Sequence, residues 1–200
     1  MLRAIRYVLW GLIAVLAGAV VLAASGVRAP WQSQANLPLA AVIGGPFELA
    51  ATSGAKLSDA TLKGQPFAIF FGYTFCPDVC PTTLLDLSNA IKQLGPDADK
   101  MRYVFVSVDP AQDSIEQLKL YLSSFDPRII GATGTEAEIA DIARKYRVVY
   151  EKVATKDGYT INHTASTYLM DAAGRFQGTF SFQDKPEIVL AKLRRLIKDG

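Results

Sequence analysis

The sequence predicts an α/β fold, with a mixed central sheet flanked by helices and one transmembrane helix before it. Two observations predict this arrangement. Apolar runs rich in β-forming residues alternate with helical patterns along residues 66–125, which is the order expected of parallel strands joined by helices. Residues 7–27, "YVLWGLIAVLAGAVVLAASGV", carry no charge and are long enough to cross the roughly 30 Å hydrocarbon core of a bilayer.

The uncharged stretch at residues 7–27 is expected to be a membrane anchor. Arg3 and Arg6 precede it, and basic residues favour keeping the short N-terminal side in the cytoplasm. A cleaved signal peptide is the alternative, because small residues such as Ala23 and Ser25 stand near the end of the stretch. Both interpretations export the folded part, which is expected on the periplasmic or outer face of a bacterial-type inner (plasma) membrane.

Four parts of the chain follow from this pattern. Residues 1–6 are expected to be a cytoplasmic N-terminus, residues 7–27 the anchor, residues 28–40 a tether without periodicity, and residues 41–200 the folded domain. The chain has 200 residues, of which 50% are hydrophobic and 20% charged, so it is long enough for one well-packed domain plus the appendage.

The elements of the domain follow from the spacing of its apolar residues. The expected strands cover residues 66–74, 102–109, 166–171 and 175–182. The first two are apolar on both faces, as central strands covered by helices are, and the last two form a hairpin that makes the sheet mixed. The expected helices cover residues 81–94, 114–125, 135–148 and 185–198. A capping box, with Thr135 and Glu138, marks the third of them. Among small α/β domains, a thioredoxin-like architecture has this order.

The charge of the chain does not indicate a nucleic-acid partner. The net charge is +2, from 21 basic and 19 acidic residues, and the two kinds are interspersed. A nucleic-acid-binding surface would require a basic patch or stripe. Nucleic acid is therefore not expected among the partners.

The segment "FFGYTFCPDVCPTT", residues 70–83, contains both cysteines of the chain, Cys76 and Cys80. Pro77 favours an extended Cys76 just past a strand. Pro81 suits the first turn of a helix, which places Cys80 at or near the N-cap, where the helix dipole favours a thiolate. The two sulfurs are therefore expected to converge on one exposed turn.

The single histidine of the chain, His163, adds a possible third donor. Two thiolates and one imidazole form a donor set that selects copper, in particular Cu(I), which tolerates three-coordination. Structural zinc normally has four protein ligands, so that Asp78 or Asp171 would have to complete a zinc site. By itself, His163 is also compatible with a hydrogen-bonded structural role.

Other interpretations of the cysteine pair stay open. In an oxidising compartment two thiols tend toward a disulfide, although a bridge across so short a loop would restrict the unfolded chain little. Cys76 and Cys80 are also the candidate catalytic pair of a thiol-disulfide oxidoreductase, although such sites more often have a CxxC spacing. A peroxide-reducing enzyme of the same fold would need only a peroxidatic cysteine and no histidine.

Four segments, the first of which contains both cysteines, carry a family resemblance: "GYTFCPDVCPTT", "VSVDP", "FDPRIIGATG" and "NHTASTYLMD". Together they resemble the Sco/SenC proteins, which are membrane-anchored, thioredoxin-fold copper-binding proteins that help assemble the copper centre of cytochrome c oxidase. The resemblance extends from about residue 41 to the end of the chain. It implies that Cys76, Cys80 and His163 bind Cu(I) or Cu(II).

The resemblance also implies a function and partners. The chain would be a membrane-anchored copper metallochaperone for the copper-binding subunit of cytochrome c oxidase, with another copper chaperone or a thioredoxin-like reductant as further partners. The same cysteines can cycle between dithiol and disulfide in this family, so the alternative is a thiol reductase for that subunit or another exported protein. One departure is visible: after "SVDP" the family commonly has an Arg-Asp-Thr-Pro run, where this chain has "QDSI" at residues 112–115.

Overall fold

The computed structural model describes residues 10–11, 43–156 and 158–199. Except at residues 10–11, the predicted anchor and the predicted tether lie outside this part of the chain. No helix among the described residues is both long enough and apolar enough to cross a bilayer. The fold described below lies within Leu39–Gly200, which forms a unit of its own.

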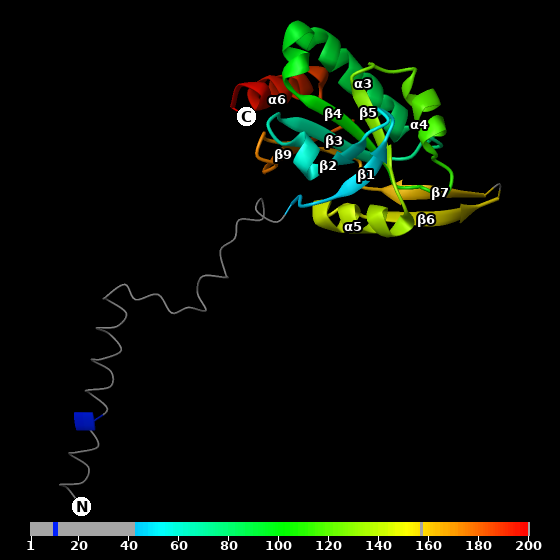
Figure 1. The fold of residues 1–200 in the computed structure, drawn as a ribbon, viewed down its shortest axis with the longest axis horizontal. Coiled ribbons are helices and arrows are strands. Elements are labelled where there is room, and N and C mark those ends of the chain that lie inside the picture. Colours follow the sequence, from blue (N-terminus) through cyan, green and yellow to red (C-terminus); the bar gives the residue numbers. More distant parts are fainter. Residues whose placement is uncertain (1–9, 12–42, 157, 200) are drawn as a thin grey trace, which may run out of the picture. The chain divides into compact units, whose positions relative to one another are not determined.

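One large sheet organises the fold (Figure 1). Its strands are β1 (Glu48–Ala51), β2 (Lys56–Ser58), β3 (Phe67–Gly72), β4 (Arg102–Ser107), β5 (Ile129–Thr133), β8 (Ser166–Met170) and β9 (Phe176–Ser181). They lie in the order β2-β1-β5-β4-β3-β8-β9. β3, β4 and β5 run parallel, whereas β8 is antiparallel to β3 and to β9. The predicted mixed sheet is confirmed, with β3 and β4 at its centre.

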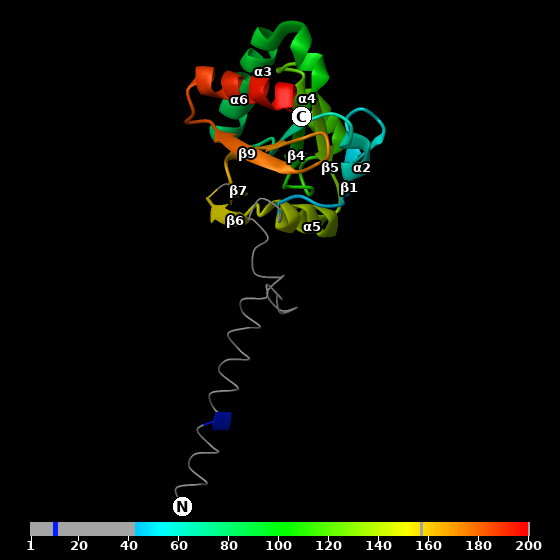
Figure 2. The same cartoon turned by 90° about the vertical axis from the view of Figure 1, so that its left-hand side faces the viewer.

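Helices cover both faces of this sheet. They are α2 (Asp59–Leu62), α3 (Val79–Leu94), α4 (Ile115–Leu122), α5 (Glu136–Tyr146) and α6 (Pro186–Asp199), and a 3₁₀ helix, η3 (Gly95–Lys100), follows α3. Figure 2 shows α3 and α6 on one side of the sheet and α5 on the other. α3, α4, α5 and α6 are the four helices that the sequence predicts, and Thr135 with Glu138 forms the expected capping box of α5.

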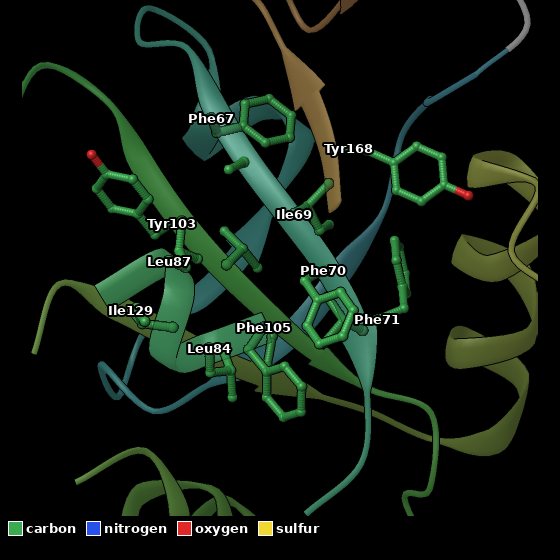
Figure 3. Close-up of a cluster of buried hydrophobic side chains, with 14 of the residues drawn as sticks. Phe67, Ile69, Phe70, Phe71, Leu84, Leu87, Tyr103, Phe105, Ile129 and Tyr168 are labelled. Atoms are coloured by element: carbon green, nitrogen blue, oxygen red, sulfur yellow. The ribbon is translucent and has the colours of Figure 1, made fainter. Parts of the chain in front are cut away.

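The core is centred on β3, all six residues of which are buried. Side chains alternate between the two faces of a strand. Phe70 therefore packs against Phe105 on the side of α3, whereas Phe71 contacts Tyr146 of α5 and Tyr168 of β8 (Figure 3). Burying one such ring stabilises the fold by roughly 1.5–3 kcal/mol. The loop that follows β3 thus leaves from the end of a completely buried strand.

A second, two-stranded sheet was not expected from the sequence. It consists of β6 (Tyr150–Thr155) and β7 (Gly158–His163), which pair with each other but not with the large sheet. The register places Tyr150 opposite His163 and Lys152 opposite Ile161. β6 is exposed along nearly its whole length and lacks the alternation of apolar and polar residues that marks a strand.

The start of α3 differs from the prediction by two residues. The N-cap is Asp78 and the first helical residue is Val79, so that Cys80 lies inside the helix rather than at its N-cap. Pro81 does not fix the boundary, because none of the first N–H groups of a helix has a partner within the helix. Proline is consequently tolerated at the third helical residue, where the structure places it.

Candidate metal centre

The structure brings together the three residues that the sequence predicts as metal ligands. Cys76 lies in the loop between β3 and α3, Cys80 in the first turn of α3 and His163 at the end of β7. One donor atom from each of them, two sulfurs and one imidazole nitrogen, lies within 4.8 Å of the other two. The sulfur of Cys80 is 3.3 Å from Nε2 of His163. Residues that are 83 positions apart therefore share one site.

Cys76, rather than Cys80, provides the sulfur that faces the helix N-terminus. The backbone N–H of Cys80 donates a hydrogen bond to Sγ of Cys76 over 3.4 Å, whereas the side chain of Asp78, at the N-cap, accepts none. Both cysteines are free. Cys76 is half-buried and Cys80 is completely buried.

This arrangement gives the two thiols opposite acidities. A hydrogen bond from the thiol of Cys80 lowers the pKa of Cys76 most, against the effect of burial. With the side chain of His163 and the backbone N–H groups of Asp78 and Cys80, it brings this pKa from the ordinary 9.0 to about 3. The same hydrogen bond and burial raise the pKa of Cys80. The expectation that the helix dipole would favour a thiolate at Cys80 is therefore wrong. The negative charge lies on the more exposed sulfur, which accepts the backbone hydrogen bonds.

The close approach of α3 to β3 requires a glycine at residue 72. A Cβ atom at Gly72 would lie 2.6 Å from Sγ of Cys80 and 2.8 Å from Cε2 of Phe105, and both distances are too short for non-bonded atoms. Glycine in a strand often marks such a close approach. The sulfur of Cys80 thus occupies the space that a side chain at residue 72 would fill.

The imidazole of His163 is oriented by its second nitrogen. Nδ1 lies 3.1 Å from the backbone carbonyl oxygen of Thr164, and because a carbonyl oxygen only accepts hydrogen bonds, Nδ1 carries the proton. In the neutral imidazole this leaves the lone pair on Nε2, the nitrogen nearest to Cys80, as in histidines that bind metals. The ring also packs edge-on against Tyr73, with the ring centroids 5.9 Å apart.

Two buried carboxylates hold the segments that carry the site. Asp113 accepts hydrogen bonds from the backbone N–H and the hydroxyl of Thr74, in the cysteine loop, over 2.9 and 2.6 Å. Asp109 accepts one from the hydroxyl of Tyr159 of β7 over 2.7 Å and forms an ion pair with Lys152 of β6 at 3.0 Å. The sequence patterns single out neither carboxylate. The available signal was that acidic residues directly follow an apolar strand in "VSVDPAQDS".

Neither aspartate that was considered as a fourth zinc ligand joins the cysteines and the histidine. The carboxylate of Asp171 accepts hydrogen bonds from the side chains of Arg175 and Gln177 instead. Asp78 lies beside Cys76 in the chain, but its carboxylate is not in the group of donor atoms. The donor set is therefore two sulfurs and one nitrogen, which suits copper better than structural zinc. Gln112, in the departure from the family pattern, is exposed and leaves Asp109 and Asp113 in place.

Comparison with known proteins gives a consistent result. The family model of SCO1/SenC matches residues 35–198. An SCO2-like protein of Rickettsia conorii is 37% identical over 155 residues, which cover 76% of each chain. The structure of Bradyrhizobium japonicum ScoI with copper bound is 51% identical, with a TM-score of 0.73, and covers 77% of this chain and 99% of that one. Arabidopsis thaliana ScoI with copper bound is 33% identical, with a TM-score of 0.74, over 79% and 99% of the two chains.

The difference in acidity predicts how the two thiols react with iodoacetamide. Because the lowered pKa keeps Cys76 ionised, its alkylation rate should stay nearly constant from about pH 6 to about pH 8, whereas an ordinary thiol gains about tenfold per pH unit. Cys80 should react far more slowly. Peptide mass spectrometry of the reduced protein measures both rates.

Cys80→Ala serves as the control for this measurement. It removes the thiol that contributes most to lowering the pKa of Cys76, so the alkylation rate of Cys76 should again rise with pH. Equal rates for both cysteines in the unmodified protein, each rising up to about pH 9, would contradict the assignment of the thiolate to Cys76.

Proposed function

The chain belongs to the SCO1/SenC family of copper-binding cytochrome c oxidase assembly proteins, and we propose that it is a copper metallochaperone that assists the assembly of the oxidase copper centre. The observation that carries this proposal is the convergence of Cys76, Cys80 and His163 within 4.8 Å. Two sulfurs and one imidazole form a complete donor set for three-coordinate Cu(I) and leave a coordination position open for Cu(II).

The three proposed copper ligands differ in whether they must lose a proton before they can bind the metal. Cys76 is already a thiolate, because its pKa is lowered, and the neutral ring of His163, with Nδ1 bonded to Thr164, has its lone pair on Nε2. Cys80, whose pKa is raised, has to release a proton when it becomes a ligand. The copper ion is the cargo in this proposal, and its affinity for thiolates supplies the driving force for that release. Proton release should therefore accompany loading.

The site opens onto the surface, as delivery to a partner requires. Cys76, Pro77 and His163 line a shallow hollow, and Phe75, which precedes Cys76 in the chain, is exposed. A metal held there is reachable by the ligands of a second protein. We assign this partner role to the copper-binding subunit of the oxidase, with another copper chaperone or a thioredoxin-like reductant as further partners.

The proposed location follows from the sequence. We propose that residues 7–27 anchor the chain in the membrane, that residues 28–40 tether the domain, and that residues 41–200 work on the periplasmic or outer face, since Arg3 and Arg6 favour a cytoplasmic N-terminus. A reporter that works only in the cytoplasm, fused after Gly200, should therefore be inactive. Activity of that fusion would overturn the proposed orientation.

Thiol-disulfide exchange is the second candidate function, and the unequal acidity of the two thiols favours it. The Cys76 thiolate would attack a partner's disulfide, which forms a mixed disulfide and releases one partner thiolate. Cys80, after losing its proton, would attack the sulfur of Cys76 and release the second partner thiolate. The partner is reduced to a dithiol, and Cys76 and Cys80 are oxidised to a disulfide.

His163 distinguishes the two functions, because an imidazole is needed for the copper site but not for thiol-disulfide exchange. We expect cells that carry His163→Ala to lose assembly of the oxidase copper centre at limiting copper. The purified variant should still reduce a partner disulfide at close to the unmodified rate. Oxidase activity and the spectrum of its copper centre in membranes, together with a disulfide-reduction assay, measure the two effects.

Cys76→Ser is the reference variant for this comparison, because both functions require that sulfur. If His163→Ala cells assemble their oxidase normally at low copper while Cys76→Ser cells do not, the delivery function fails. The thiol reductase function would then replace it.

A further inference from the structure

The histidine of the site lies on a sheet that is separate from the sheet that positions the cysteines. β6 and β7 pair only with each other among the described strands, whereas the cysteine loop follows β3 at the centre of the large sheet. A lone two-stranded hairpin is marginally stable in water. The position of His163 relative to the cysteines therefore depends on how this hairpin is attached to the domain.

One face of the hairpin makes these attachments. Because side chains alternate along a strand, Tyr159, Ile161 and His163 lie on the same face of β7, and Lys152 lies opposite Ile161 on β6. Ile161 is the one residue within the described part of β6 and β7 that is classed as buried, at 3% exposure. Tyr150 and Tyr159 are partly buried and also pack against the core, so apolar packing and polar contacts together attach the hairpin.

The attachment nearest to His163 is made by Tyr73. Its hydroxyl accepts a hydrogen bond from the backbone N–H of Ile161 over 3.2 Å and lies 2.8 Å from the hydroxyl of Thr160. Tyr73 directly follows β3, so this contact links the hairpin to the cysteine loop. The contact fixes β7 at residues 160 and 161.

The second attachment is made by Asp109, further along the hairpin. This residue lies in the loop between β4 and α4 and is 1% exposed. Its Oδ2 accepts the hydroxyl of Tyr159 over 2.7 Å, and its Oδ1 lies 3.0 Å from Nζ of Lys152. The ammonium group of Lys152 also lies over the ring of Tyr159, 4.6 Å from its centroid. One buried carboxylate thus binds both strands of the hairpin at once.

The loop that contains Asp109 is itself fixed. The backbone N–H of Asp109 donates to the hydroxyl of Ser107, and the backbone N–H of Asp113 donates to the carbonyl oxygen of Asp109 over 2.9 Å. Asp113 in turn holds Thr74 of the cysteine loop. The attachment of the hairpin and the attachment of the cysteine loop therefore share one rigid loop.

We propose that Asp109 is a positioning residue for His163, which acts through Lys152 and Tyr159 and thereby sets the affinity of the site for Cu(II) relative to Cu(I). The inference rests on the proposed function. Two thiolates are enough to hold Cu(I), whereas Cu(II) favours imidazole nitrogen as a donor. Loss of the attachment displaces the imidazole and leaves the two sulfurs where they are. Cu(II) binding is therefore affected more strongly than Cu(I) binding.

The test uses Lys152→Met and Tyr159→Phe in the full-length protein, purified in detergent. Each variant removes one contact of Asp109 and keeps most of the side chain. Residues that support a metal ligand typically contribute 10-fold to 100-fold in affinity, so the dissociation constant for Cu(II) should rise about 10-fold. The dissociation constant for Cu(I), measured by competition with a chromogenic chelator, should rise by a clearly smaller factor, because both thiolates stay in place.

Matched variants separate this role from a general effect of charge or stability. Lys156→Met removes a lysine from the exposed turn of the same hairpin and should leave the affinity for Cu(II) unchanged. Lys152→Arg keeps the positive charge, so it should retain most of the affinity for Cu(II) that Lys152→Met loses. The melting temperature and the near-ultraviolet circular dichroism show whether each variant is folded. If Lys152→Met does not fold, Tyr159→Phe, which loses only a hydroxyl, decides the question.

The outcomes distinguish this inference from the proposed function. If His163→Ala weakens Cu(II) binding while Lys152→Met and Tyr159→Phe do not, the positioning role is wrong and the copper site stands. If the two variants weaken Cu(I) and Cu(II) binding equally, the positioning role is also wrong. If His163→Ala itself leaves Cu(II) binding unchanged, both the copper site and the positioning role fail.

Discussion

The site depends on the two buried carboxylates in the loop between β4 and α4. Asp113 holds the cysteine loop through Thr74, and Asp109 holds the histidine hairpin through Lys152 and Tyr159. Burying a carboxylate is unfavourable unless it is hydrogen-bonded or paired, and both of these are. Because the loop follows β4, next to β3 in the sheet, the buried centre of the large sheet fixes the two halves of the site relative to each other.

The same packing gives the two cysteines different properties. Gly72 allows the first turn of α3 to approach β3, which buries Cys80 and leaves Cys76 at the helix N-terminus, half-exposed. A shared hydrogen bond then lowers the pKa of Cys76 and raises the pKa of Cys80. An exposed thiolate beside a buried thiol suits both stepwise copper binding and thiol-disulfide exchange. Copper binding also needs the imidazole of His163, which lies on a different sheet, whereas thiol-disulfide exchange does not need it.

The sequence predicts the parts of this fold that depend on local patterns. β3, β4 and the four longer helices were predicted because their apolar residues follow a strand or helix period, and the donor residues were found because cysteine and histidine have few chemical alternatives. The hairpin was missed because β6 is mostly exposed. Asp109 was missed because its partner Tyr159 is 50 positions away, and no local pattern reveals such a contact. Pro81 misplaced the helix start, since proline is accepted throughout a first turn.

The central claim is that two thiolates and one imidazole from these two separately held segments bind one copper ion. Copper K-edge X-ray absorption of the protein loaded with one equivalent of Cu(I) tests it most directly. We expect a first coordination shell of two sulfurs and one nitrogen, with the multiple-scattering pattern of an imidazole, and loss of that nitrogen in His163→Ala. A shell of sulfur alone, identical in the protein and in His163→Ala, would contradict the account.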